Sequence, residues 1–181
     1  MINIQDSVAK ATKTLIFSEP LYGLFLIGIN KKYSIRIPTA GVSKNNIGVQ
    51  LTINPEFFTD LSLDHRLGLI KHELLHIAFG HLVLRSKYAD KKLFNIAADL
   101  EINQYIRTDR LPDGGLLLSS FPELNLKAKG GTKYYYDKLL EAQQDGTSPT
   151  LDSLMSQMQG DTPYCHTTWD EFDELPEADK K

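Results

Sequence analysis

Cysteine is almost absent from this chain, which has one, Cys165, among its 181 residues. A single thiol excludes an internal disulfide and is typical of a reducing compartment. It also disfavours a purely structural zinc site, because such sites are usually built from four Cys or His ligands. Since no nearby group stands out that would activate it, Cys165 is interpreted as a small core residue and not as a nucleophile or a ligand.

Long hydrophobic runs and an excess of positive charge are also lacking. The most apolar early stretch, residues 21–29, is too short to span a bilayer and is predicted to be a buried strand or core segment. The first residues lack the basic start and apolar centre of a signal peptide, so we expect a cytoplasmic protein without membrane attachment. The net charge of -3 provides no reason to expect nucleic-acid binding.

Apolar residues at helical spacing predict the main helices. They cover residues 5–17, 63–77, 93–106 and 132–142. Asp60 or Ser62 is expected to cap the second helix, and Gly80 to end it.

Alternating apolar and polar residues predict a small antiparallel or mixed sheet. Its strands are expected at residues 33–37 and 47–53, with a turn at 41–46 between them. Residues 143–160 are expected to form a mobile loop with a short helix around 151–158. We expect one domain over residues 1–170, followed by an acidic tail over 171–181.

The stretch His72-Glu73-Leu74-Leu75-His76 falls inside the predicted helix 63–77. Residues four apart lie on the same helix face, so the imidazoles of His72 and His76 can bind one metal ion. Glu73 leans towards the open side of such a metal, where a carboxylate can take a proton from water. Catalytic zinc usually has three protein ligands, so the sequence predicts a third ligand elsewhere.

Asp99 is the favoured third ligand. With Asn95 and Asn103 it forms a polar line, at steps of four, along an otherwise apolar predicted helix. A carboxylate among apolar neighbours is costly to bury unless a metal or a donor pairs with it. Asn103, one turn after Asp99, could orient a ligating histidine from the outer shell.

Two other residues stay open as the third ligand. His81 follows His76 by five positions, and its alternative role is to satisfy free carbonyls at the helix end. Glu101 points away from Asp99 and is expected on a solvated face.

His166 is a candidate of another kind, because it lies far along the chain near the lone Trp169. A hydrolase needs a donor for the oxyanion that forms when water attacks a carbonyl, and an imidazolium can serve. A structural role for His166 is the equal alternative.

Several segments together resemble the putative metallopeptidase domain of bacterial and phage proteins. They are the 72–76 motif with Gly80-His81, Asn95 to Asp99, Ile102-Asn103, Leu111-Pro112, and His166 with Trp169. The resemblance covers most of residues 8–170. It implies a zincin-like α+β fold, with a small sheet packed on the active-site helix and further helices. In that family the domain often precedes a von Willebrand factor A-like domain, so the expected partners, besides the substrate, are a regulatory protein or a domain of that kind.

The resemblance further implies one zinc ion held by His72, His76 and Asp99, with Glu73 as the base. The sequence therefore predicts a zinc-dependent peptidase acting on a peptide or protein substrate, with His166 as an oxyanion donor. Strand 47–53 is predicted to be an edge to which an extended substrate could add. A non-catalytic, zinc-stabilised protein-binding module and a zinc hydrolase of a non-peptide amide are the alternatives.

Overall fold

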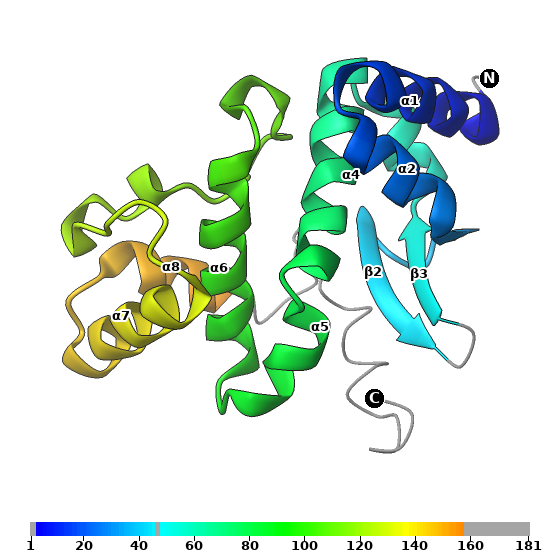
Figure 1. Ribbon diagram of the computed structural model, residues 1–181. Helices are drawn as coiled ribbons and strands as arrows, with labels where there is room; N and C mark the ends of the chain where they lie inside the picture. Colours follow the sequence, from blue (N-terminus) through cyan, green and yellow to red (C-terminus); the bar gives the residue numbers. More distant parts are fainter. Residues whose placement is uncertain (1–2, 46–47, 158–181) are drawn as a thin grey trace.

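Helix α4, Leu63–Ala78, runs through the middle of the molecule (Figure 1). The computed structural model describes residues 3–45 and 48–157. Ser62 caps α4, because its side-chain oxygen accepts a hydrogen bond from the backbone N–H of His65 at 3.2 Å. Leu67, Ile70 and Leu74 are buried along the helix. The predicted helix and the Ser62 cap are confirmed.

Three strands form a mixed sheet beside α4, so the fold is α+β (Figure 1). The order is β1-β3-β2, with bounds Asn30–Tyr33 for β1, Ala40–Asn45 for β2 and Gly48–Ile53 for β3. β1 pairs with β3 in parallel, and β2 pairs with β3 antiparallel. The predicted strand 47–53 is confirmed as β3 from residue 48 onwards. Because β3 is paired on both sides, the expectation that it is an edge strand is wrong.

The other sheet predictions need correction. Residues 41–45, expected in a turn, belong to β2, where cross-strand pairing with β3 outweighs the local turn preference of Gly41 and Ser43. The strand expected at 33–37 is wrong except for its first residue, because β1 covers Asn30–Tyr33 and Ile35 is exposed in the turn that follows. In both cases the strand bounds depend on which strand lies alongside, and the local sequence pattern does not contain that information.

Helices α1, Ile4–Ser18, and α2, Pro20–Gly28, pack together on the sheet side of α4 (Figure 1). α1 confirms the first predicted helix. α2 replaces the expected strand or core segment at 21–29, since Pro20 suits the first turn of a helix and a uniformly apolar run does not distinguish helix from strand. Leu21, Leu24 and Ile27 are exposed on it.

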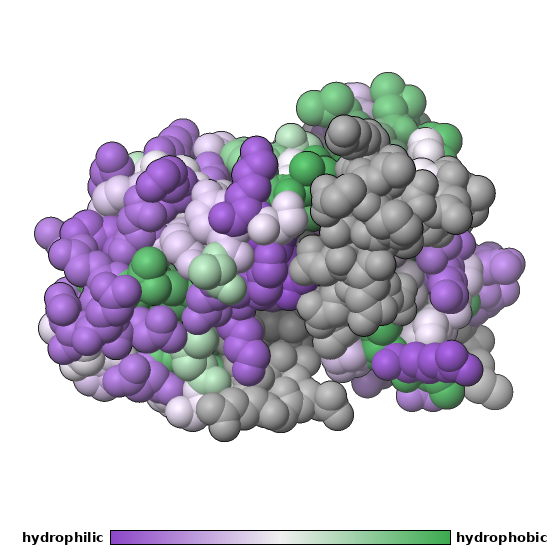
Figure 2. Space-filling model, turned by 90° about the horizontal axis from the view of Figure 1, so that it is seen from below, coloured by the Kyte–Doolittle hydropathy of each residue, from purple (hydrophilic) through white to green (hydrophobic). Residues whose placement is uncertain are grey.

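Exposed hydrophobic surface is unevenly distributed. Figure 2 shows hydrophobic surface at upper right, on the half of the molecule that carries α1, α2 and the sheet. The opposite half, which carries α7 and α8, is mostly hydrophilic on this face.

Helix α6, Lys91–Ile102, lies between α4 and α7, Thr132–Asp145, and contacts both (Figure 1). The helix predicted over 93–106 ends at Ile102 and continues as the 3-10 helix η2, Asn103–Tyr105. α7 extends three residues beyond its predicted end. Within the segment expected to be a mobile loop, residues 149–157 form α8, Pro149–Gln157, which confirms the short helix there.

Short helical segments complete the described chain. They are α3 Pro55–Asp60, α5 His81–Leu84, η1 Arg85–Lys87, η3 Thr108–Arg110, η4 Leu118–Ser120 and η5 Pro122–Leu124. Within residues 3–45 and 48–157, no single helix has both the length and the apolar composition to cross a membrane. The bent pair formed by α4 and residues 81–87 meets these criteria only when its parts are taken together.

Gly68 lets η3 approach α4 closely. A Cβ atom at Gly68 would lie 1.8 Å from the carbonyl oxygen of Arg110, whose side chain is itself paired with Asp64 and Glu19. We expect Gly68→Ala to lower the free energy of unfolding by about 1–3 kcal/mol, because backbone must move to relieve the overlap. Urea denaturation measures this. Gly28→Ala, where nothing lies within 4 Å of the added atom, is the matched control; equal stabilities of the two variants would contradict the close approach.

Candidate metal centre

Helix α4 places His72 and His76 one turn apart on one side. Their Nε2 atoms are 3.0 Å apart, and the two rings meet edge to face. His76 is fully buried, whereas the side chain of His72 is 16% exposed. The two nitrogens therefore converge on one point at the edge of the core.

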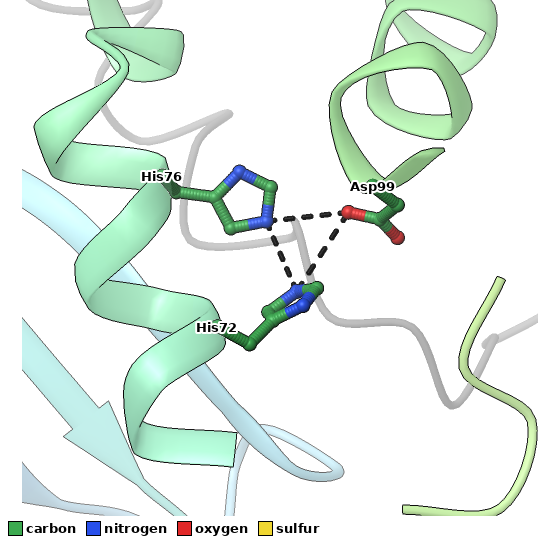
Figure 3. A group of neighbouring side chains, drawn as sticks. All are labelled: His72, His76 and Asp99. Atoms are coloured by element: carbon green, nitrogen blue, oxygen red, sulfur yellow. Dashed lines mark hydrogen bonds and ion pairs between the residues drawn. The ribbon is translucent and has the colours of Figure 1, made fainter. Parts of the chain in front are cut away.

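Asp99 reaches the same point from α6. Its Oδ1 atom lies 3.2 Å from Nε2 of His76 and 3.7 Å from Nε2 of His72, and the residue is 3% exposed. Figure 3 shows the three side chains pointing at one another from the two helices. Among the described residues, these three form the group that could hold a metal ion.

The spacing of the three atoms fits a zinc ion. Three ligand atoms in tetrahedral sites at about 2.0–2.1 Å from zinc lie about 3.3 Å from one another. The observed separations of 3.0, 3.2 and 3.7 Å bracket this value. Two imidazoles and one carboxylate are also a ligand set that zinc accepts in catalytic sites.

Asn103 holds His72 from behind. Nδ2 of Asn103 donates to the carbonyl oxygen of Leu116 at 2.8 Å, so its Oδ1 faces Nδ1 of His72, also at 2.8 Å. An amide oxygen can only accept, so Nδ1 of His72 carries the proton and Nε2 of the neutral ring is left with its lone pair. This is the outer-shell contact that the spacing of Asp99 and Asn103 predicts, and such contacts orient metal ligands.

Glu73 is buried beside the group. It is 3% exposed, and burial is the largest cause that raises the pKa of its carboxyl to about 8. The negative charge of Asp99 raises this pKa further, and a hydrogen bond from the backbone of Val42 lowers it. Oε2 of Glu73 has no hydrogen-bond partner among the described residues. A divalent cation at the three neighbouring side chains would favour the ionised carboxylate, the form that accepts a proton.

His81 does not join this group. It begins α5 directly after Gly80, whose φ of 70° turns the chain, and its ring lies behind His76. Nδ1 of His81 is 2.9 Å from Nδ1 of His76, on the side of that ring away from Asp99. The alternative that His81 is the third ligand is therefore not supported. It is also not a capping residue, because its ring contacts side chains and is fully buried.

Glu101 is not on a solvated face, so that expectation is wrong. It is 8% exposed, because α7 covers the side of α6 that faces away from α4. Its Oε2 accepts a hydrogen bond from Oγ1 of Thr132 at 2.5 Å. Sequence reasoning missed Thr132 as a residue near the site; its only signal was a polar residue at the start of a predicted helix.

The candidate oxyanion donor His166 lies outside the described residues, as do Cys165 and Trp169.

These side chains define a candidate metal site of the kind that metal-dependent hydrolases use. The site consists of two histidines one helical turn apart, a carboxylate from a second helix and an adjacent buried glutamate. Comparison with protein families agrees with this class. The chain belongs to the family described as the putative metallopeptidase domain, whose model matches residues 5–164.

The relatives add little beyond the family. A Thermotoga maritima protein described as uncharacterized is 30% identical over 104 residues, which are 56% of this chain. The match covers 26% of that protein, so the chain spans about a quarter of its length. No solved structure matches the chain.

Proposed function

We propose that this chain is a zinc-dependent peptidase with a zincin-like site. The observation that carries the proposal is the convergence of His72, His76 and Asp99 at separations suited to zinc, with Glu73 buried beside them. The family description supports the reaction class. Peptides or proteins are the substrates that this class implies.

Each residue of the site has its own proposed role. His72, His76 and Asp99 would hold one zinc ion, which would polarise a peptide carbonyl and acidify a water molecule. Glu73 accepts a proton from the attacking water and passes it to the leaving amine. We further propose His166 as the donor to the developing oxyanion, on the sequence argument alone.

Glu73 favours an enzyme over a zinc-stabilised binding module. Oε2 of Glu73 is buried and has no hydrogen-bond partner within residues 3–45 and 48–157, which costs folding free energy, and a site that only holds the fold together has no use for such an oxygen. A general base, by contrast, needs a free oxygen that can reach water.

Zinc removal and return tests the proposal. We expect the purified chain to bind one zinc ion, measured by elemental mass spectrometry, and to cleave a mixed peptide library. A chelator should abolish cleavage and zinc should restore it. Bound zinc without any cleavage would instead favour the binding module, and cleavage restricted to small amides would favour a non-peptide amide hydrolase. A chain that binds no zinc would contradict the proposal.

A further inference from the structure

Four buried side chains form a continuous hydrogen-bonded line that starts at His76, one of the three residues of the candidate metal site. Nδ1 of His76 is 2.9 Å from Nδ1 of His81, and Nε2 of His81 is 2.9 Å from Oγ1 of Thr132. Oγ1 of Thr132 is 2.5 Å from Oε2 of Glu101. The side chains come from four helices, α4, α5, α7 and α6, and none of the four residues is more than 8% exposed.

The line has one direction of donation when Glu101 is a carboxylate. A carboxylate only accepts, so the hydroxyl of Thr132 donates to Glu101. The oxygen of Thr132 then accepts from Nε2–H of His81. Each neutral imidazole has one donor and one acceptor nitrogen, so Nδ1 of His81 accepts from Nδ1–H of His76. Nε2 of His76 is left with its lone pair, and it is the atom that faces Asp99.

We propose that His81, Thr132 and Glu101 are positioning residues that fix the tautomer and ring orientation of His76 as a metal ligand. The inference rests on the proposed metal site, but not on peptide cleavage. It gives His76 the same kind of support that Asn103 gives His72, from a different set of helices. A neutral histidine ring has two tautomers, and only the one with a bare Nε2 can bind the metal at this point.

Thr132 is the member whose replacement isolates the effect. Thr132→Val keeps the shape of the side chain but removes the hydroxyl, so His81 loses its acceptor and both tautomers of His81 become available. Thr132→Ser restores the hydroxyl. Loss of an outer-shell partner typically costs tenfold to a hundredfold in metal affinity, and we expect Thr132→Val to lose zinc affinity by that factor while Thr132→Ser stays near the native value.

Zinc affinity, measured by competition with a chromophoric chelator, is the readout for both variants. Thr12→Val is the matched control, because the Thr12 hydroxyl donates within α1, to the carbonyl oxygen of Val8; it should leave the affinity unchanged. Urea denaturation of the metal-free proteins shows how much stability each variant loses. If Thr132→Val loses stability but keeps native zinc affinity, Thr132 is merely structural and the proposal is overturned.

Nitrogen-15 NMR of the wild-type imidazoles supplies a measurement that needs no variant. We expect the zinc-loaded protein to carry the His81 proton on Nε2 and the His76 proton on Nδ1; a proton on Nδ1 of neutral His81 would overturn the proposal. Zinc binding without peptide cleavage would refute the proposed peptidase but would not contradict the positioning role of His81, Thr132 and Glu101. A wild-type chain that binds no zinc would overturn both.

Discussion

Replacing Glu73 by glutamine is expected to lower peptide hydrolysis by about 10²–10⁴-fold, the usual contribution of a general acid–base group, while zinc remains bound. Glutamine has nearly the same shape as glutamate, but its amide does not accept a proton from the attacking water. His72, His76 and Asp99 are untouched, so the metal group stays complete. The quantities to measure are kcat/KM on a cleaved library peptide and the zinc content of the same sample.

Unfolding is not expected to explain this loss. Burial raises the pKa of Glu73 to about 8, which means that the site disfavours the charged form, and a neutral glutamine avoids that cost. Circular dichroism and the denaturation midpoint should therefore match or exceed those of the native protein. Glu56→Gln, at an exposed position in α3, serves as the matched control with full activity. A Glu73→Gln variant that cleaves at the native rate would contradict the proposed role of Glu73 as the general base.

Replacing Asp99 by asparagine is expected to lower zinc affinity by at least about 100-fold, more than loss of an outer-shell partner typically costs. The change keeps the volume of a residue that is 3% exposed, but it removes the negative charge from the oxygen nearest His76. Two histidines alone would be left as strong ligands. Chelator competition measures the affinity, and peptide cleavage should fall in parallel at limiting zinc.

Glu101→Gln is the informative control for Asp99→Asn. Both residues are buried acids on α6, but only Asp99 lies in the three-residue group. A glutamine amide can donate as well as accept, so the direction of donation to His76 is less firmly fixed, and we expect Glu101→Gln to lose zinc affinity by no more than the tenfold to hundredfold typical of an outer-shell partner, which is less than Asp99→Asn loses. The reverse result, with Asp99→Asn near native and Glu101→Gln strongly weakened, would show that Glu101 is the ligand.

Local patterns predicted the long helices of this fold well and its sheet only in part. The caps and apolar spacing of α4 are properties of neighbouring residues, and the predicted helix was confirmed. β2 was missed because its residues become a strand only when β3 lies beside them. The apolar run of α2 gave no period to separate helix from strand, and the structure exposes several of its apolar side chains.

The sequence could predict that the candidate ligands lie close together within each helix, because a helix brings residues four apart onto one face whatever surrounds it. That rule puts His72 beside His76, and it puts Asp99 and Asn103 on one side of α6. An acid in an apolar stripe then indicates a partner, since an isolated buried charge is costly.

The positions of His81 and Glu101 behind the candidate ligands depend on tertiary structure alone. The ring of His81 turns towards His76 because the chain bends at Gly80, and Glu101 is buried because α7 covers the far side of α6. Neither fact is encoded within a few residues of His81 or Glu101. The sequence could therefore propose His72, His76 and Asp99 as candidate metal ligands, but only the packing of α4, α5, α6 and α7 places His81, Thr132 and Glu101 behind His76.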